Sequence, residues 1–117
     1  MTTNIFIIAA IIFFEARGEP LEGKYAVLSC IQNGTPIHCF APWSRKGVRE
    51  LDVMKEIREA QEFGSWVECL TIAMEKEEVP RYPFTHFYNP TYAVNPMKLY
   101  RTRKISKHLF GVVNENT

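Results

Sequence analysis

The sequence is poor in the residues on which metal-dependent and thiol-dependent chemistry relies. Its 117 residues include three histidines, three cysteines and a single aspartate, Asp52. Cys30, Cys39 and Cys69 have neither metal-ligand nor redox spacing, and an odd number of cysteines cannot all pair within one chain. We therefore expect reduced thiols in the core or near the surface, no metal and no cofactor.

Charge of one sign and long hydrophobic runs are also lacking. The net charge is +1, which excludes the strong positive field that favours nucleic acid. The longest apolar run, residues 5–14, is too short to cross a bilayer. No basic residue precedes it and no small-residue cleavage site comes after it, so it does not resemble a signal peptide. We expect a buried first helix, no stable membrane insertion, and synthesis in the cytoplasm without a signal peptide.

The composition is globular, 46% hydrophobic and 23% charged, and the length fits one domain over residues 1–117. Capping residues and breakers predict four helices, one up to residue 16 and the others at about 20–33, 49–61 and 65–77. Residues 35–49 are expected to be irregular. We expect Leu51, Met54 and Ile57 to face inward from the third helix, and Gly64 to separate it from the fourth.

The last third of the chain is expected to form a small sheet. Residues 84–88 are rich in β-forming side chains and predict a strand. Residues 98–102 predict a second strand that pairs with the first in a hairpin-like sheet, and residues 104–113 predict a short helix or strand. The fold class is therefore α+β, mostly helical with a small antiparallel β element.

Glu15 ends the apolar run and is the first candidate for chemistry. Burial at such a position raises the pKa of a carboxyl group, and a neutral carboxylic acid can donate a proton. The alternative is a helix end with solvated charges, since Arg17 and Glu19 lie directly beyond it. Glu19 lies after the break at Gly18 and is expected to cap or orient this region. Because Asp52 lies in a charged helical stretch, a two-carboxylate glycosidase mechanism would have to recruit a second glutamate.

Aromatic and polar side chains form a second group of candidates. Strand alternation places His86 and Tyr88 on one face, next to Asn89, and such side chains bind the hydroxyl and amide groups of sugars. The alternative is an aromatic core strand. Trp43, in the irregular stretch, either stacks on a sugar or anchors its loop in the core.

Basic residues gather near the C-terminus. Such a stretch is usually a solvated face, and the alternative is that it attracts an anionic polymer. The stretch consists of Lys98, Arg101, Arg103, Lys104 and Lys107.

Four segments, in this order, resemble the SleB-type cell wall hydrolases, a family of spore-cortex-lytic enzymes and their phage relatives. Residues 14–20 (Phe-Glu-Ala-Arg-Gly-Glu-Pro) with 22–27 resemble the opening motif and second helix of the family. Residues 39–44, 85–90 (Thr-His-Phe-Tyr-Asn-Pro) and 105–110 resemble its Phe-containing loop, aromatic strand and C-terminal motif. The chain departs from the family at Pro83 and Phe84, where a Gly-Ala pair is usual, and at Ser106, where glycine is frequent.

This resemblance implies a compact lysozyme-like domain, similar to the lytic transglycosylases, that acts on peptidoglycan glycan strands. In that mechanism one glutamic acid protonates the oxygen between N-acetylmuramic acid and N-acetylglucosamine, and then acts as the base while a 1,6-anhydro ring closes. The resemblance assigns this acid/base role to Glu15. The expected substrate-binding residues are Glu19, Trp43, His86, Tyr88 and Asn89.

Two other functions remain open from the sequence. One is a hydrolysing muramidase that uses Glu15 with a second glutamate. The other is a glycan-binding or virion structural protein without turnover. In each case we expect a monomer whose partner is peptidoglycan. An enzyme made without a signal peptide fits a phage or prophage lysin that is released through a membrane lesion or carried on the virion.

Overall fold

The apolar run forms the central helix of the protein. The computed structural model describes residues 4–93 and 97–114, and helix α1 covers Ile5–Ala16. The Ile7 backbone N–H donates a hydrogen bond of 2.9 Å to the side-chain oxygen of Asn4, which caps the helix. Residues 8–13 are at most 3% exposed, because other elements cover α1 on several sides. The expectation of a buried first helix is confirmed.

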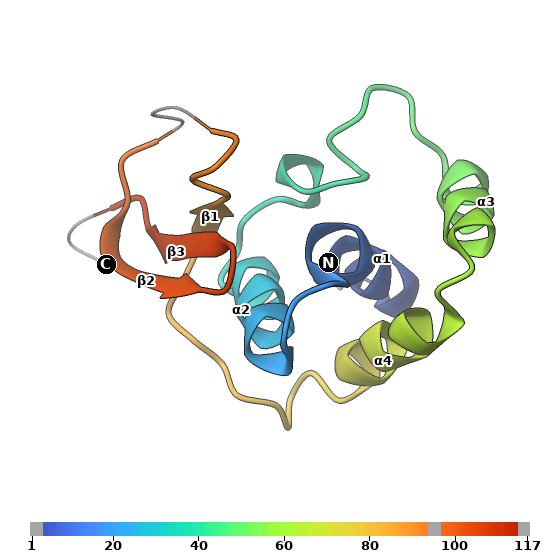
Figure 1. Ribbon diagram of the computed structural model, residues 1–117, viewed down its shortest axis with the longest axis horizontal. Helices are drawn as coiled ribbons and strands as arrows, with labels where there is room; N and C mark the ends of the chain where they lie inside the picture. The colour runs from blue at the N-terminus through green and yellow to red at the C-terminus, as the bar shows by residue number, and fades with distance from the viewer. Residues whose placement is uncertain (1–3, 94–96, 115–117) are drawn as a thin grey trace.

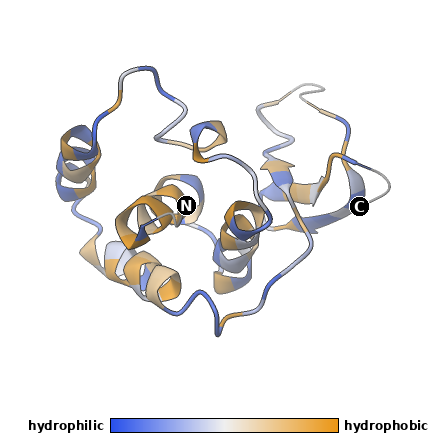
Figure 2. Ribbon diagram, turned by 180° about the vertical axis from the view of Figure 1, so that it is seen from behind, coloured by the Kyte–Doolittle hydropathy of each residue, from blue (hydrophilic) through white to orange (hydrophobic). Residues whose placement is uncertain are grey.

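Three further helices surround α1. Helix α2 (Leu21–Gln32) begins after Pro20, and α3 (Glu50–Ala60) and α4 (Phe63–Met74) come after an irregular stretch that contains a short 3-10 turn, η1 (Ile37–Cys39). Figure 1 shows α1 in the middle of the molecule, with α2 on one side and α3 and α4 on the other. Coloured by hydropathy, α1 is the most continuously apolar of the helices (Figure 2). The four helices predicted from the sequence are therefore present: α1 ends at the predicted residue, α2 and α3 are slightly shorter at both ends, and α4 begins and ends earlier than predicted.

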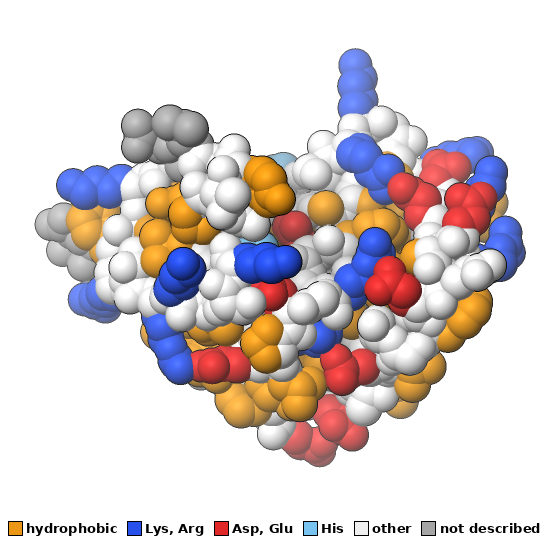
Figure 3. All heavy atoms as spheres, viewed as in Figure 1, with side chains coloured by type: hydrophobic (Ala, Val, Ile, Leu, Met, Phe, Trp, Pro, Cys, Tyr) orange, Lys and Arg blue, Asp and Glu red, His pale blue; other side chains and the backbone are white. Residues whose placement is uncertain are grey.

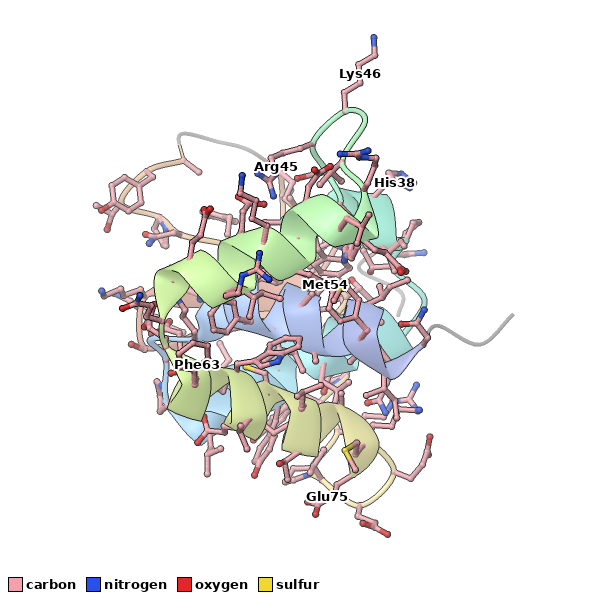
Figure 4. All side chains as sticks on the ribbon, turned by 90° about the vertical axis from the view of Figure 1, so that its right-hand side faces the viewer. His38, Arg45, Lys46, Met54, Phe63 and Glu75 are labelled. Atoms are coloured by element: carbon pink, nitrogen blue, oxygen red, sulfur yellow. The ribbon has the colours of Figure 1, made fainter. Side chains whose placement is uncertain are left out.

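Two details predicted for α3 and α4 are wrong. Leu51 and Met54 are 69% and 51% exposed, because α3 lies at the edge of the molecule and buries only Val53 and Ile57, one helical turn apart. Figure 4 looks onto this edge and labels Met54 on α3 and Phe63 at the start of α4. Gly64 does not interrupt the helices, since it lies in the first turn of α4.

The sheet has three antiparallel strands in the order β1-β3-β2. They are β1 (His86–Tyr88), β2 (Tyr100–Ile105) and β3 (His108–Val112). The predicted pairing of the first two strands is wrong, because β3 lies between them and pairs Phe110 with Phe87. The physical reason is burial. Strand β3 carries the apolar side chains of the sheet, whereas β2 exposes four successive residues and occupies the edge.

The sheet and the helices share one cluster of buried side chains, to which β2 contributes Ile105 and β3 contributes Phe110. The fold is therefore α+β and mostly helical, as expected. Cys30 and Cys69 are buried and Cys39 is exposed, and none of the three forms a disulfide. Within the described residues, no helix has the length and apolar character needed to cross a membrane.

Candidate functional site

Glu15 lies in the last turn of α1, where the central helix leaves the core. Its side chain is partly buried, and the Ala41 backbone N–H approaches its Oε2 atom at 3.4 Å. Burial raises the pKa of Glu15 above its ordinary value of 4.5, and the contact with Ala41 opposes this only in part. The residue therefore keeps its proton to a higher pH than an exposed glutamate, as a general acid must.

Glu19 is the second carboxylate of this region, and the turn between β2 and β3 holds it. It is 8% exposed, and the Lys107 backbone N–H donates a 3.2 Å hydrogen bond to its Oε1 atom. His108 Nδ1 lies 3.1 Å from the same oxygen, although the ring N–H is not aligned for a hydrogen bond. Burial lowers the pKa of His108, and the nearby Glu19 offsets this only in part. The turn thus brings Lys107 and His108 next to the end of α1.

The two glutamates line one hollow of about 270 Å³. Arg17, Asn89, Lys107 and His108 also line it. The space-filling view shows a notch between the sheet side and the helical side of the molecule, with acidic and histidine side chains inside it (Figure 3). The Arg17 side chain is already engaged, since its Nε atom pairs with Glu62 at 2.9 Å. The surface of this hollow is mainly polar, and we call it the polar hollow.

A second hollow, of about 170 Å³, is also lined by Glu15. Phe40 and Phe87 line it, and their stacked rings have centroids 6.1 Å apart. His86 and Cys39 line it as well, and burial lowers the pKa of His86. Its surface is mainly apolar, and we call it the aromatic hollow. Glu15 is therefore the residue at which a polar and an aromatic hollow meet, which suits a ligand with different groups on either side of a reacting bond.

The structure brings together most, but not all, of the residues expected at the site. Glu19 and Asn89 lie with Glu15 in the polar hollow, and His86 lies with it in the aromatic hollow. Tyr88 is not among the described residues that line either hollow. Trp43 also lines neither. It packs edge-to-face on Phe6 of α1, with ring centroids 6.5 Å apart, so it anchors its loop to the core.

Sequence reasoning missed three contributors to the site. It places Lys107 in a basic stretch and gives no site role to Lys107, His108 or Phe87, although all three line the hollows. The missed signal was the pattern of β3, whose apolar residues mark it as the central strand. In the structure β3 lies between β1 and β2, and the turn before it contacts Glu19 just beyond the end of α1.

The described residues provide no set of metal ligands at this site. Among residues 4–93 and 97–114, no three His, Cys, Asp or Glu side chains are grouped so that they could hold a metal ion. The chemistry within reach of this site is general acid and base catalysis through a desolvated carboxyl group, next to polar groups that bind hydroxyls and amides.

Comparison with known proteins adds no relative: no family model, no curated protein and no solved structure matches this chain.

Proposed function

We propose that this protein cleaves the glycan strand of bacterial peptidoglycan between N-acetylmuramic acid and N-acetylglucosamine, as a lytic transglycosylase with Glu15 as its acid and base. The observation that carries the proposal is the position of Glu15. Burial favours its protonated form, and yet the side chain lines two hollows, so a ligand in either one reaches it. The resemblance of the sequence to SleB-type hydrolases supplies the substrate class.

The proposed reaction needs one carboxyl group. The Glu15 carboxyl donates its proton to the bridging oxygen, and the bond from muramic acid C1 to that oxygen breaks as the N-acetylglucosamine 4-hydroxyl leaves. The resulting carboxylate accepts the proton of the muramic acid 6-hydroxyl, whose oxygen bonds to C1 and closes the 1,6-anhydro ring. Glu15 ends the cycle protonated, and water is not consumed.

The proposal includes a lysozyme-like arrangement of the chain. Its support is the location of Glu15 at the C-terminal end of a buried helix, between the helices and a small antiparallel sheet. An acidic residue in an apolar setting with a raised pKa is the means by which lysozyme keeps its general acid protonated.

A hydrolysing muramidase is the second candidate, and Glu19 is the observation that favours it. Glu19 lines the polar hollow together with Glu15. A second carboxylate in the same hollow is what a glycosidase needs to activate water or to stabilise the sugar cation. In that case water takes the place of the 6-hydroxyl, and the product has a reducing end.

Turbidity loss of purified peptidoglycan, combined with mass spectrometry of the released fragments, tests these proposals. Glu15→Gln is expected to abolish release, since the amide cannot donate the proton. Glu59→Gln, on an exposed part of α3, is the matched control and is expected to retain full release. Anhydro ends identify the transglycosylase and reducing ends the hydrolase. Full activity of Glu15→Gln would exclude both, and binding without any release would support a non-catalytic role.

A further inference from the structure

Lys107 is a basic residue of the polar hollow that the proposed reaction does not use. Lys107 lines the polar hollow beside Glu15, and it makes no ion pair with any residue that the structure describes. Two other basic side chains near the site have partners. Arg17 pairs with Glu62, and Arg103 pairs with Glu22. Lys107 is therefore the cation in this hollow that remains available to a ligand.

The backbone fixes where Lys107 stands. It belongs to the tight turn that joins β2 to β3, in which Ser106 adopts a left-handed conformation with φ of 53°. The Lys107 N–H is bonded to the Glu19 carboxylate, so the turn is tied to the end of α1. The base of the Lys107 side chain is thus held in place while its charged end stays free. A positioned cation of this kind serves recognition of an anion better than a lysine on a mobile loop does.

Neither carboxyl group in the polar hollow forms an ion pair with Lys107. Burial raises the pKa of Glu15, and no ion pair joins its carboxyl group to Lys107 among the described residues. The Glu19 carboxylate is engaged by the Lys107 backbone N–H and lies against His108. Neither glutamate has a side-chain oxygen paired with the Lys107 ammonium. An incoming carboxylate would therefore meet an unneutralised positive charge.

We propose that Lys107 binds a carboxylate carried by the muramic acid unit of the substrate, so that the polar hollow takes muramic acid and the aromatic hollow takes N-acetylglucosamine. This rests on the proposed function. N-acetylmuramic acid bears an anionic substituent, either the free lactyl group or the carboxylates of an attached stem peptide, whereas N-acetylglucosamine is neutral. The half-buried Phe87, which stacks on the buried Phe40, offers an apolar surface to the neutral sugar. Lys107 is thus a specificity residue that sets the direction of the strand across Glu15.

The test compares Lys107→Gln with Lys104→Gln on three forms of soluble glycan strand. Lys104 is an exposed lysine on β2 that lines neither hollow, which makes it a matched control for charge. The strands carry intact stem peptides, or free lactyl groups after amidase treatment, or carboxylates converted to neutral amides. Steady-state kinetics give KM and kcat for each protein variant on each form of strand. Thermal unfolding checks that the variants fold.

Lys107→Gln is expected to raise KM about three- to tenfold on a charged strand and to leave kcat nearly unchanged, as loss of a charge-assisted contact predicts. On amidated strands it is expected to match the wild type. The charged strand that shows the effect identifies which carboxylate is bound. The inference is overturned if Lys107→Gln leaves KM unchanged on both charged strands, if it raises KM equally on amidated strands, or if Lys104→Gln has the same effect.

Failure of the proposed function gives a different result. In that case the wild type releases no product from any of the strands. Calorimetric binding of the charged and amidated strands then decides the inference about Lys107 separately. Weaker binding of the charged strands by Lys107→Gln alone supports it, and equal binding by the wild type and both variants overturns it.

Discussion

A buried lysine beneath the site allows a sharp test of how the turn after α1 is held. Lys24 of α2 is 4% exposed, and its ammonium group donates a hydrogen bond to the Glu19 backbone carbonyl. It also pairs at 3.0 Å with Glu68 of α4, whose side chain is 44% exposed. The pair is therefore asymmetric: one charge is sealed inside the protein, whereas the other has access to water.

This asymmetry predicts unequal effects on stability when each partner is removed. Glu68→Ala leaves a buried ammonium without its counter-charge. In a sealed site this change lowers the free energy of unfolding by several kcal/mol. Here the expected loss is about 2–3 kcal/mol, because water reaches the Glu68 position. Lys24→Met removes the buried charge, fills a similar volume and leaves Glu68 hydrated. Its main cost is the Glu19 carbonyl that loses its donor, about 1 kcal/mol. The double variant should equal Lys24→Met, since Glu68 has no buried partner left to stabilise.

Urea unfolding monitored by tryptophan fluorescence measures these differences, provided that the dependence on urea is the same in all variants. The expected order of destabilisation is Glu68→Ala first, then Lys24→Met and the double variant together. A greater loss for Lys24→Met than for Glu68→Ala would refute the reasoning. Additive losses in the double variant would also do so, because they would mean that the two side chains act independently.

The Glu15 carboxyl group, the three thiols and the turn before β3 give one further prediction each. Because the folded protein holds the Glu15 proton more tightly than the unfolded chain, the stability that this proton contributes is full below about pH 4.5 and is lost as pH rises through the raised pKa. Glu15→Gln should therefore be more stable than the wild type at pH 8 and lose this advantage at pH 4 in urea unfolding; equal stability at both would contradict it. A chromogenic disulfide reagent should modify Cys39 alone in the folded protein, because burial raises the pKa of Cys30 and Cys69 to about 12. Rapid reaction of two or three thiols would show that the core is open. Ser106→Gly should raise the free energy of unfolding by about 0.5–1 kcal/mol in thermal melts, since glycine adopts φ of 53° without strain; a decrease would mean that the serine side chain stabilises the turn.

The helices could be predicted from the sequence because local signals determine them. The Asn4 cap, the ten apolar residues and the break near Gly18 define α1, and Pro20 marks the start of α2. Glu15 could be found for the same reason, since it comes directly after the apolar run. Features that depend on the nearest neighbours in the chain were within reach of sequence reasoning.

The predictions were wrong where contacts between distant segments of the chain determine the structure. Gln61, in a left-handed conformation, separates α3 from α4, and nothing in its side chain signals this. Leu51 and Met54 are spaced like core residues, but α3 packs on the core through Val53 and Ile57 instead. The order of the strands, and with it the meeting of Lys107 with Glu19, depends on tertiary packing, for which the apolar pattern of β3 is the local signal that sequence reasoning missed.

Helix α1 also has a consequence for how the protein is made. Its main packing partner among the helices is α4, whose Trp66 contacts Phe6 and Phe13 at ring-centroid distances of 5.9 and 5.8 Å. Helix α4 ends about 60 residues after the apolar run. At ordinary rates of translation, roughly 3–12 s therefore pass between the synthesis of α1 and the synthesis of the helix that packs on it. During that interval the nascent chain displays ten apolar residues without a charge, a segment prone to aggregate. The yield of folded protein in a cell should therefore depend on chaperone supply and on translation speed between α1 and α4, more than on the stability of the finished fold.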